Sequence, residues 1–271
     1  MTRPTAIISD ADGTLIDTVA LIRHGQFETV KAYLAQVGLP TNDIPAYDAF
    51  EKVLHDHIGG SAHDTLMRTV TALYETQPGY LNRINFDNLH ALLNPTQDIL
   101  APTYVKPYRG LGELFKALSE LNIKLGIFTS GTAHHIVRNF GIALSELGLS
   151  ALYKENTIKD DEKLKIFCET LQTYYGLPAF TVVTCDDVTT HKPNPESLRL
   201  ALKRLDTDPK ECMVFGDHQV DMQAGANARA GQCVGVTHGF HASDKLVAAG
   251  ATEVVSSLTE LAVKLRVTIK L

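Results

Sequence analysis

The most restrictive feature of this sequence is the alternation of short apolar segments with amphipathic segments after Pro107. A short apolar run bounded by turn signals predicts a buried strand, whereas apolar residues three and four apart predict a helix. Strands are predicted at residues 6–9, 124–128, 181–184, 213–215, 233–236 and 253–255. Helices are predicted between them at residues 111–121, 133–140, 195–205, 222–230 and 244–249. Such alternation is typical of a parallel sheet, so we expect an α/β fold with helices flanking the sheet.

Residues 18–105 interrupt this alternation directly after the first strand. Their apolar residues recur at helical spacing, as in Phe27, Val30 and Leu34, and turn signals separate one helical run from the next. The chain of 271 residues is also longer than the roughly 250 residues that one hydrophobic core usually organises. We therefore expect an α/β core made of residues 1–17 and 106–271, and an inserted helical domain made of residues 18–105.

Composition and charge exclude several functional classes. Lys and Arg number 25 against 31 Asp and Glu, and no basic run could follow a phosphate backbone, so nucleic acid is not an expected partner. No apolar run is long enough for a membrane span or a signal peptide, which predicts no membrane association and a cytoplasmic location. The four cysteines are widely spaced and are expected to be reduced core residues. Nothing in the sequence predicts the oligomeric state.

Polar side chains follow the predicted strands at the point where each strand ends. In open α/β sheets, ligands bind beyond the carboxyl ends of the strands, so these residues are the candidates for a site. They are Asp10 and Asp12 after the first strand, Thr129 and Ser130 after the second, Lys192 after the third, and Asp217 and Asp221 after the fourth.

This set of side chains favours phosphate chemistry supported by a divalent cation. Asp10 and Asp12 are two residues apart, so in an extended segment both point into one pocket. Carboxylates gathered there would repel one another unless a hard cation such as Mg²⁺ lay among them. Lys192 and Thr129 could then hold the oxygens of a phosphoryl group while Asp10 attacks phosphorus. Asp12 could protonate the leaving oxygen and later accept a proton from water.

The same residues resemble four motifs of the haloacid dehalogenase superfamily, in the family's order and spacing. The motifs are Ile8-Ser-Asp10-Ala-Asp12-Gly-Thr14, Gly126-Ile-Phe-Thr129-Ser-Gly, His191-Lys192-Pro-Asn-Pro-Glu196 and Val214-Phe-Gly216-Asp217-His-Gln-Val-Asp221. The chain is most similar to the group of phosphoglycolate phosphatases and β-phosphoglucomutases. The resemblance implies a Rossmannoid parallel sheet with an all-helical cap of the C1 type, inserted after the first motif.

The resemblance also implies a role for each residue. It makes Asp10 the nucleophile and a metal ligand, and Asp12 the acid/base and a metal ligand through its backbone carbonyl. Thr129, Ser130 and Lys192 bind phosphate. The metal is Mg²⁺, bound by Asp217, with Asp221 acting through water. Asp12 suits an alkoxide leaving group, which favours a phosphatase that hydrolyses a phosphate monoester of a small metabolite through an aspartyl phosphate.

Two other functions remain open from the sequence. A phosphomutase of the β-phosphoglucomutase type is one, although Ala62 stands where such mutases carry an arginine for a second phosphate. A regulator that binds phosphate without turnover is the other. Gly60, Ser61 and His63 lie in a glycine-containing loop of the insertion, which either contacts substrate and sets specificity or only connects two helices.

Overall fold

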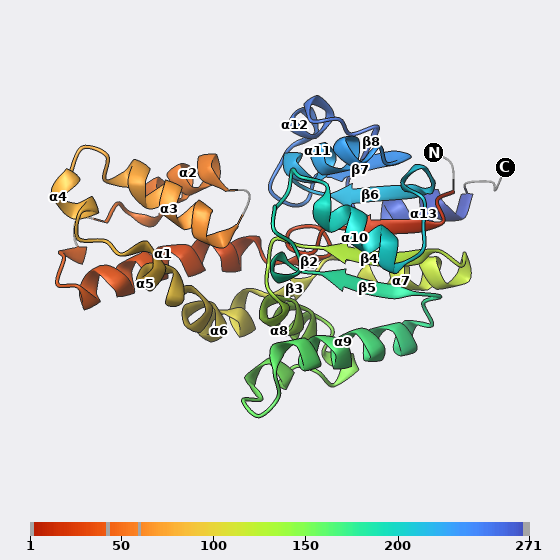
Figure 1. Cartoon of the computed structure of the whole chain (residues 1–271), viewed down its shortest axis with the longest axis horizontal. Coiled ribbons are helices and arrows are strands. Elements are labelled where there is room, and N and C mark those ends of the chain that lie inside the picture. The colour runs from red at the N-terminus through yellow and green to blue at the C-terminus, as the bar shows by residue number, and fades with distance from the viewer. Residues whose placement is uncertain (1–2, 42–43, 59–60, 268–271) are drawn as a thin grey trace. The chain divides into compact units, whose positions relative to one another are not determined.

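The computed structural model describes residues 3–41, 44–58 and 61–267. The chain divides into two compact units, and each is described by itself. The α/β unit is made of Met1–Thr18 and Val105–Leu271, and the helical unit is Val19–Tyr104 (Figure 1).

A six-stranded parallel sheet forms the centre of the α/β unit. Its strand order is β5-β4-β1-β6-β7-β8. The strands are β1 (Ala6–Ser9), β4 (Lys124–Phe128), β5 (Phe180–Val183), β6 (Cys212–Gly216), β7 (Gln232–Val236) and β8 (Glu253–Val255). The predicted α/β class and all six predicted strands are confirmed, because short apolar runs are buried by helices on both faces of such a sheet.

The order of the strands reverses direction at β1. After β1 the chain adds β4 and β5 on one side, and then β6, β7 and β8 on the other. In the ladder, Ser9 lies opposite Ile127 of β4 and Phe215 of β6, so these three strands end at nearly the same level. This is the topological switch point of the sheet, where crevices for ligands form beyond the strands.

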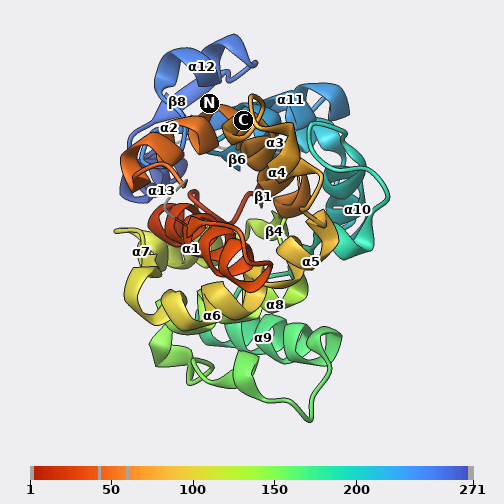
Figure 2. The same cartoon turned by 90° about the vertical axis from the view of Figure 1, so that its left-hand side faces the viewer.

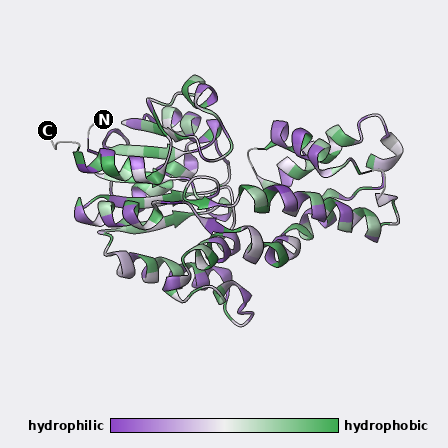
Figure 3. Ribbon diagram, turned by 180° about the vertical axis from the view of Figure 1, so that it is seen from behind, coloured by the Kyte–Doolittle hydropathy of each residue, from purple (hydrophilic) through white to green (hydrophobic). Residues whose placement is uncertain are grey.

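Helices cover both faces of the sheet, with α10 and α11 on one side and α7 and α13 on the other (Figure 2). The helices of this unit are α7 (Leu111–Glu120), α8 (Ala133–Ala143), α9 (Asp160–Tyr175), α10 (Glu196–Arg204), α11 (Gln219–Ala228), α12 (Ser243–Ala248) and α13 (Leu258–Val267). Short 3₁₀ turns lie at Ser145–Leu147, Leu152–Lys154, Cys185–Asp187 and Pro209–Glu211. The strands form an apolar layer between the helices, visible as green in Figure 3.

One face of the sheet packs in a fully apolar core. Ile8 of β1 and Val214 of β6 are fully buried against Leu198 of α10 and Met222 of α11. Burying a side chain of this size contributes about 1.5–3 kcal/mol. The core therefore holds β1 and β6 rigidly, and the residues that follow these strands start from fixed positions.

The helical unit has a core of its own. It consists of α1 (Val19–Gln36), α2 (Tyr47–His57), α3 (Ala62–Leu73), α4 (Pro78–Leu81), α5 (Phe86–Ala91) and α6 (Leu93–Tyr104). Val30, Phe50, Leu66 and Leu89, each from a different helix, are buried together. The helical insertion after the first strand, predicted as part of the fold, is confirmed.

Two very short strands lie next to the ends of the helical unit. β2 (Ile16–Asp17) pairs antiparallel with β3 (Lys106–Pro107), with Ile16 opposite Pro107. The segments that lead into and out of the helical unit are thereby hydrogen-bonded to each other within the α/β unit.

The structure also bears on the expectations from composition. None of the helices in the described ranges is long and apolar enough to cross a membrane. All four cysteines are free; Cys212 and Cys233 are buried as predicted, whereas Cys168 and Cys185 are only partly buried. Burial raises the pKa of all four thiols, to about 12 for Cys212 and to about 11 for Cys233.

Candidate active site

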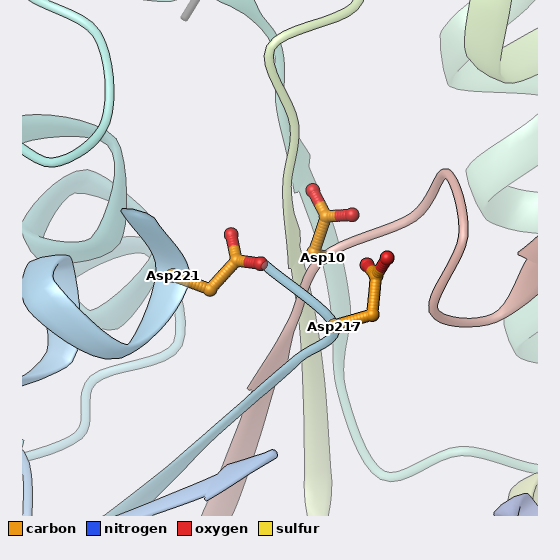
Figure 4. A group of neighbouring side chains, drawn as sticks. All are labelled: Asp10, Asp217 and Asp221. Carbon is orange, nitrogen blue, oxygen red and sulfur yellow. The ribbon is translucent and has the colours of Figure 1, made fainter. Parts of the chain in front are cut away.

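Three carboxylates meet beyond the carboxyl ends of β1 and β6. Asp10 directly follows β1, Asp217 directly follows β6, and Asp221 lies in the first turn of α11. One carboxylate oxygen from each lies within 4.8 Å of the other two, and the three carboxyl groups point into the same space (Figure 4). All three residues are buried, with Asp10 the most exposed at 7%. We call this group the acidic triad.

The backbone extends β1 by one residue to place Asp10. The N–H of Asp10 donates to the carbonyl of Phe215 at 2.9 Å, which continues the ladder between β1 and β6. The hydroxyl of Ser9 donates to the carbonyl of Asp10 at 2.7 Å. Asp10 is therefore held by the rigid centre of the sheet rather than by a loose loop.

Each carboxylate oxygen of Asp217 accepts a hydrogen bond. The Thr14 hydroxyl donates to its Oδ1 at 2.6 Å, and the Phe240 N–H donates to its Oδ2 at 2.7 Å. A Cβ atom at Gly239 would lie 2.1 Å from Oδ2, and one at Gly13, whose φ is +82°, would lie 2.6 Å from it. Only glycine therefore allows both segments to approach this carboxylate so closely.

Asp221 belongs to the cap of its own helix. Its Oδ2 accepts from the N–H of His218, and the His218 ring accepts from the N–H of Val220, which together cap the start of α11. A carboxylate in the first turn of a helix is also stabilised by the helix dipole. Asp221 therefore contributes both to the start of α11 and to the acidic triad.

Lys192 links two members of the triad. Its Nζ lies 2.5 Å from Asp10 Oδ1, 2.7 Å from Asp221 Oδ1 and 3.2 Å from the carbonyl of Phe128. The side chain is buried, and Nζ also lies 4.3 Å from the centre of the Phe128 ring. The lysine thus offers the triad a fixed positive charge from the loop after β5.

The charges of this site do not balance without a cation. Burial and the nearby Asp221 raise the pKa of Asp10 while Lys192 lowers it, and together they bring it to about 6. Burial, with Asp10 and Asp221 nearby, also holds the pKa of Asp217 well above its ordinary value. Three carboxylates and one ammonium leave a formal charge of −2, which a divalent cation would neutralise. The oxygen donors of the triad fit a hard cation of this charge.

Asp12 is not a member of the triad and is more exposed than the three residues that form it. Asn139 Nδ2 donates to Asp12 Oδ1 at 2.8 Å. The pKa of Asp12 is raised, first by burial of its carboxyl group and then by the charge of Asp10; the Thr18 hydroxyl, Arg138 and Asn139 oppose the shift. A carboxyl group with a raised pKa that remains partly accessible is suited to exchange a proton with a reacting group.

Thr129 and Ser130 follow β4, as predicted. Thr129 is buried; its N–H donates to the carbonyl of Val183 at 3.0 Å, and its Oγ1 accepts from the N–H of Gly131 at 2.9 Å. Ser130, the next residue after Thr129, is partly exposed. Thr132, not Thr129, caps α8 through its hydroxyl. The role of Thr129 and Ser130 in phosphate binding stays a prediction.

The residues predicted to set specificity belong to the helical unit. Gly60 lies outside the described residues. The Ser61 hydroxyl caps α3, accepting from the N–H of Asp64 at 3.0 Å and donating to its carboxylate at 2.7 Å. His63 Nε2 lies 3.4 Å from Asp87 Oδ1, and the rings of His63 and His90 form a T-shaped pair with centroids 5.3 Å apart. These contacts support the local role of Ser61, and substrate contact by the three residues stays a prediction.

Comparison with known proteins identifies the family of this site. A family model described as haloacid dehalogenase-like hydrolase matches residues 4–229. The chain belongs to this family. It is thus an enzyme of the hydrolase class, and the resemblance of its four motifs is confirmed.

One curated relative is similar in sequence, and two solved structures are similar in fold. The pyrophosphatase PpaX of Bacillus velezensis is 33% identical over 230 residues, which cover 83% of this chain and 80% of that protein. A predicted phosphoglycolate phosphatase from Haemophilus somnus has the same fold, with a TM-score of 0.71, 16% identity and coverage of 98% and 99% of the two chains. A protein assigned as a β-phosphoglucomutase from Thermotoga maritima gives a TM-score of 0.64 at 20% identity over 99% and 100% of the two chains.

Proposed function

We propose that this haloacid dehalogenase-like hydrolase is a Mg²⁺-dependent phosphatase that hydrolyses a phosphate monoester of a small metabolite. The observation that carries the proposal is the placement of Asp10: a buried carboxylate at the end of the central strand, 2.5 Å from the Lys192 ammonium and beside two further carboxylates. Such a site supplies a nucleophile, fixed positive charge and oxygen ligands for a metal in one place.

Asp10 and Asp12 divide the reaction into two halves. In the first half, a carboxylate oxygen of Asp10 bonds to phosphorus as the bond to the leaving oxygen breaks, and Asp12 gives its proton to that oxygen. In the second half, water attacks phosphorus, the aspartyl phosphate opens, and the ionised Asp12 takes a proton from the water. The greater exposure of Asp12 supports its assignment as the group that meets leaving group and water.

Lys192 and the acidic triad provide the electrostatic part. The Lys192 ammonium can offset negative charge that develops on the phosphoryl oxygens, with Thr129 and Ser130 as further phosphate ligands. Asp10, Asp217, Asp221 and the backbone carbonyl of Asp12 would hold Mg²⁺ directly or through water. When bound, the cation together with Lys192 would neutralise the triad, and the cation would polarise the phosphoryl group.

Inorganic pyrophosphate is a second candidate substrate, because the 33% identical relative PpaX is named as a pyrophosphatase. Its leaving group is phosphate, which needs less protonation than an alkoxide. Asp12→Ala should therefore reduce kcat/KM much less on pyrophosphate than on an alkyl phosphate. A comparably large loss of kcat/KM on both substrates would contradict the expectation that a phosphate leaving group needs less protonation than an alkoxide.

The test is phosphate release by the purified chain with Mg²⁺ from a panel containing sugar phosphates, phosphoglycolate, nucleotides, pyrophosphate and an aryl phosphate. The proposal expects turnover with at least one compound, and loss of that turnover in a folded Asp10→Asn variant. Conversion of a hexose 1-phosphate to the 6-phosphate without phosphate release would instead identify a phosphomutase. Folded protein that binds phosphate but turns over none of the panel would favour the regulatory alternative.

A further inference from the structure

Asn139 is a buried polar residue outside all four motifs, and it reaches the candidate acid/base. It lies on α8, 127 positions from Asp12, and its Nδ2 donates to Asp12 Oδ1 at 2.8 Å. The residue is only 4% exposed. A buried amide group must form hydrogen bonds to offset its loss of water, and the contact with Asp12 supplies one of them.

Arg138 determines which end of the Asn139 amide faces Asp12. The Nε of Arg138 donates to Asn139 Oδ1 at 2.9 Å, and the arginine is 1% exposed. A guanidinium group has only donors, so the amide oxygen must face Arg138. The N–H₂ group of Asn139 is thereby directed at Asp12, and the amide cannot turn over without losing both hydrogen bonds.

The direction of this amide has a consequence for the two oxygens of Asp12. Because Oδ1 accepts the Asn139 N–H, a proton on the carboxyl group belongs on Oδ2. We propose that Asn139, oriented by Arg138, is a positioning residue that fixes the orientation of the Asp12 carboxyl: the amide holds Oδ1, and Oδ2 is directed to the leaving oxygen. This inference rests on the proposed function, in which Asp12 is the general acid.

The experiment compares two esters that differ in their need for that proton. A primary alkyl phosphate such as β-hydroxyethyl phosphate requires protonation of its leaving oxygen, whereas p-nitrophenyl phosphate scarcely does. The kcat/KM of each ester covers the steps up to release of the alcohol, so the ratio of the two values isolates leaving-group protonation. Both are measured with Mg²⁺ for the wild type, Asn139→Asp and Asn139→Leu.

The two variants disturb the contact in different ways. Asn139→Asp keeps an acceptor for Arg138 but replaces the N–H that faces Asp12, whereas Asn139→Leu removes both hydrogen bonds. Val137→Ala is the control, because Val137 is a fully buried apolar residue on the same helix.

Since misplacing a reacting group can cost about 100-fold, we expect kcat/KM on the alkyl ester to fall by about 10-fold or more in both Asn139 variants. On the aryl ester we expect less than about a threefold loss, and for Val137→Ala equal changes on both esters.

A double-mutant cycle keeps the inference falsifiable even if Asn139→Leu does not fold. In an Asp12→Ala background, Asn139→Asp should leave the ratio of alkyl to aryl kcat/KM unchanged, because Asn139 acts through Asp12. Equal losses on both esters, no loss on either, or a further change of the ratio without Asp12 would overturn the inference. Wild-type protein that hydrolyses neither these esters nor any other would contradict the proposed function itself, whereas the outcomes above contradict only the role of Asn139.

Discussion

The ammonium of Lys192 lies 2.5 Å from the carboxylate of Asp10, and both groups are buried at the end of the central strand. The same ammonium lies 2.7 Å from Asp221, so one cation is shared by two anions of the acidic triad. Breaking a buried ion pair from one side leaves a charge without its partner and usually costs about 3–5 kcal/mol. The Lys192 ammonium therefore affects both the stability of the folded protein and the reaction proposed for Asp10.

Removing Lys192 should therefore affect both properties. In the absence of metal, Lys192→Met is expected to lower the free energy of unfolding by about 3 kcal/mol, measured by chemical denaturation. Phosphatase activity should fall by about 100-fold or more, because a charge that supports the reacting phosphoryl group is lost. Lys264→Met is the matched control, since that lysine pairs with Glu253 at the surface. A loss of stability no larger than that of the control would contradict the buried pair.

Asp10 should make the metal-free protein less stable as the pH rises. Its pKa is raised from 3.8 to about 6 in the fold, so the folded state binds more protons than the unfolded state between these values. The stabilising contribution of the protonated group is complete below pH 3.8 and is lost as the pH rises through about 6. A shift of this size corresponds to about 3 kcal/mol.

The variant Asp10→Asn isolates this contribution. In EDTA, the free energy of unfolding of Asp10→Asn minus that of the wild type should increase between pH 4 and 7 by about 2.4 kcal/mol, most of the full contribution. Saturating Mg²⁺ should shrink or reverse the difference at pH 7, because the cation stabilises the ionised carboxylates. Parallel pH dependences of the two proteins in EDTA would contradict the raised pKa.

Asp217→Asn should have opposite effects on stability and on metal binding. Asp217 is 1% exposed and lies beside Asp10 and Asp221, so loss of its charge removes repulsion from the metal-free site. We expect a higher free energy of unfolding in EDTA, together with a Kd for Mg²⁺ raised by about 10-fold or more, measured by titration calorimetry. A variant that is less stable in EDTA yet binds Mg²⁺ normally would oppose the assignment.

Gly239→Ala should displace Asp217 without changing any charge. The new Cβ would lie 2.1 Å from Asp217 Oδ2 and 2.4 Å from the carbonyl of Gly13, so the carboxylate or the backbone must move. Affinity for Mg²⁺ and phosphatase activity should both fall by about 10-fold or more. Gly79→Ala serves as the control, because a Cβ at Gly79 would meet nothing within 4 Å. Equal behaviour of the two variants would show that the close approach of Gly239 is unimportant.

Local patterns were sufficient to predict the strands and the residues that follow them. A buried strand in a parallel sheet is a short apolar run, and polar chemistry begins where the run stops, as in the step from Ile8 to Asp10. α9 was not predicted, because Lys163, Phe167 and Leu171 are its buried positions and the resulting apolar stripe is narrow. α13 was not predicted either, although Leu258, Leu261 and Leu265 lie on its buried side.

The partners that hold the candidate site were less accessible to sequence analysis. Thr14 binds Asp217 across 203 positions, and Asn139 binds Asp12 across 127. Neither contact can be predicted from the spacing of residues along the chain, because only the fold brings these segments together. The adjacent arginine and asparagine between the apolar residues Val137 and Phe140 are the one sign that could have drawn attention to Asn139.

The central claim is that Asp10 becomes phosphorylated during turnover. It is tested most directly by an acid-quenched single turnover of the Asp12→Ala variant with a labelled aryl phosphate and Mg²⁺, followed by mapping of the label by mass spectrometry. Loss of the base should slow opening of the aspartyl phosphate, so the account predicts that the phosphoryl group accumulates on Asp10 and is absent from Asp10→Asn. Wild-type protein that hydrolyses the ester, while the variant carries no label or carries it on a residue other than Asp10, would contradict the account.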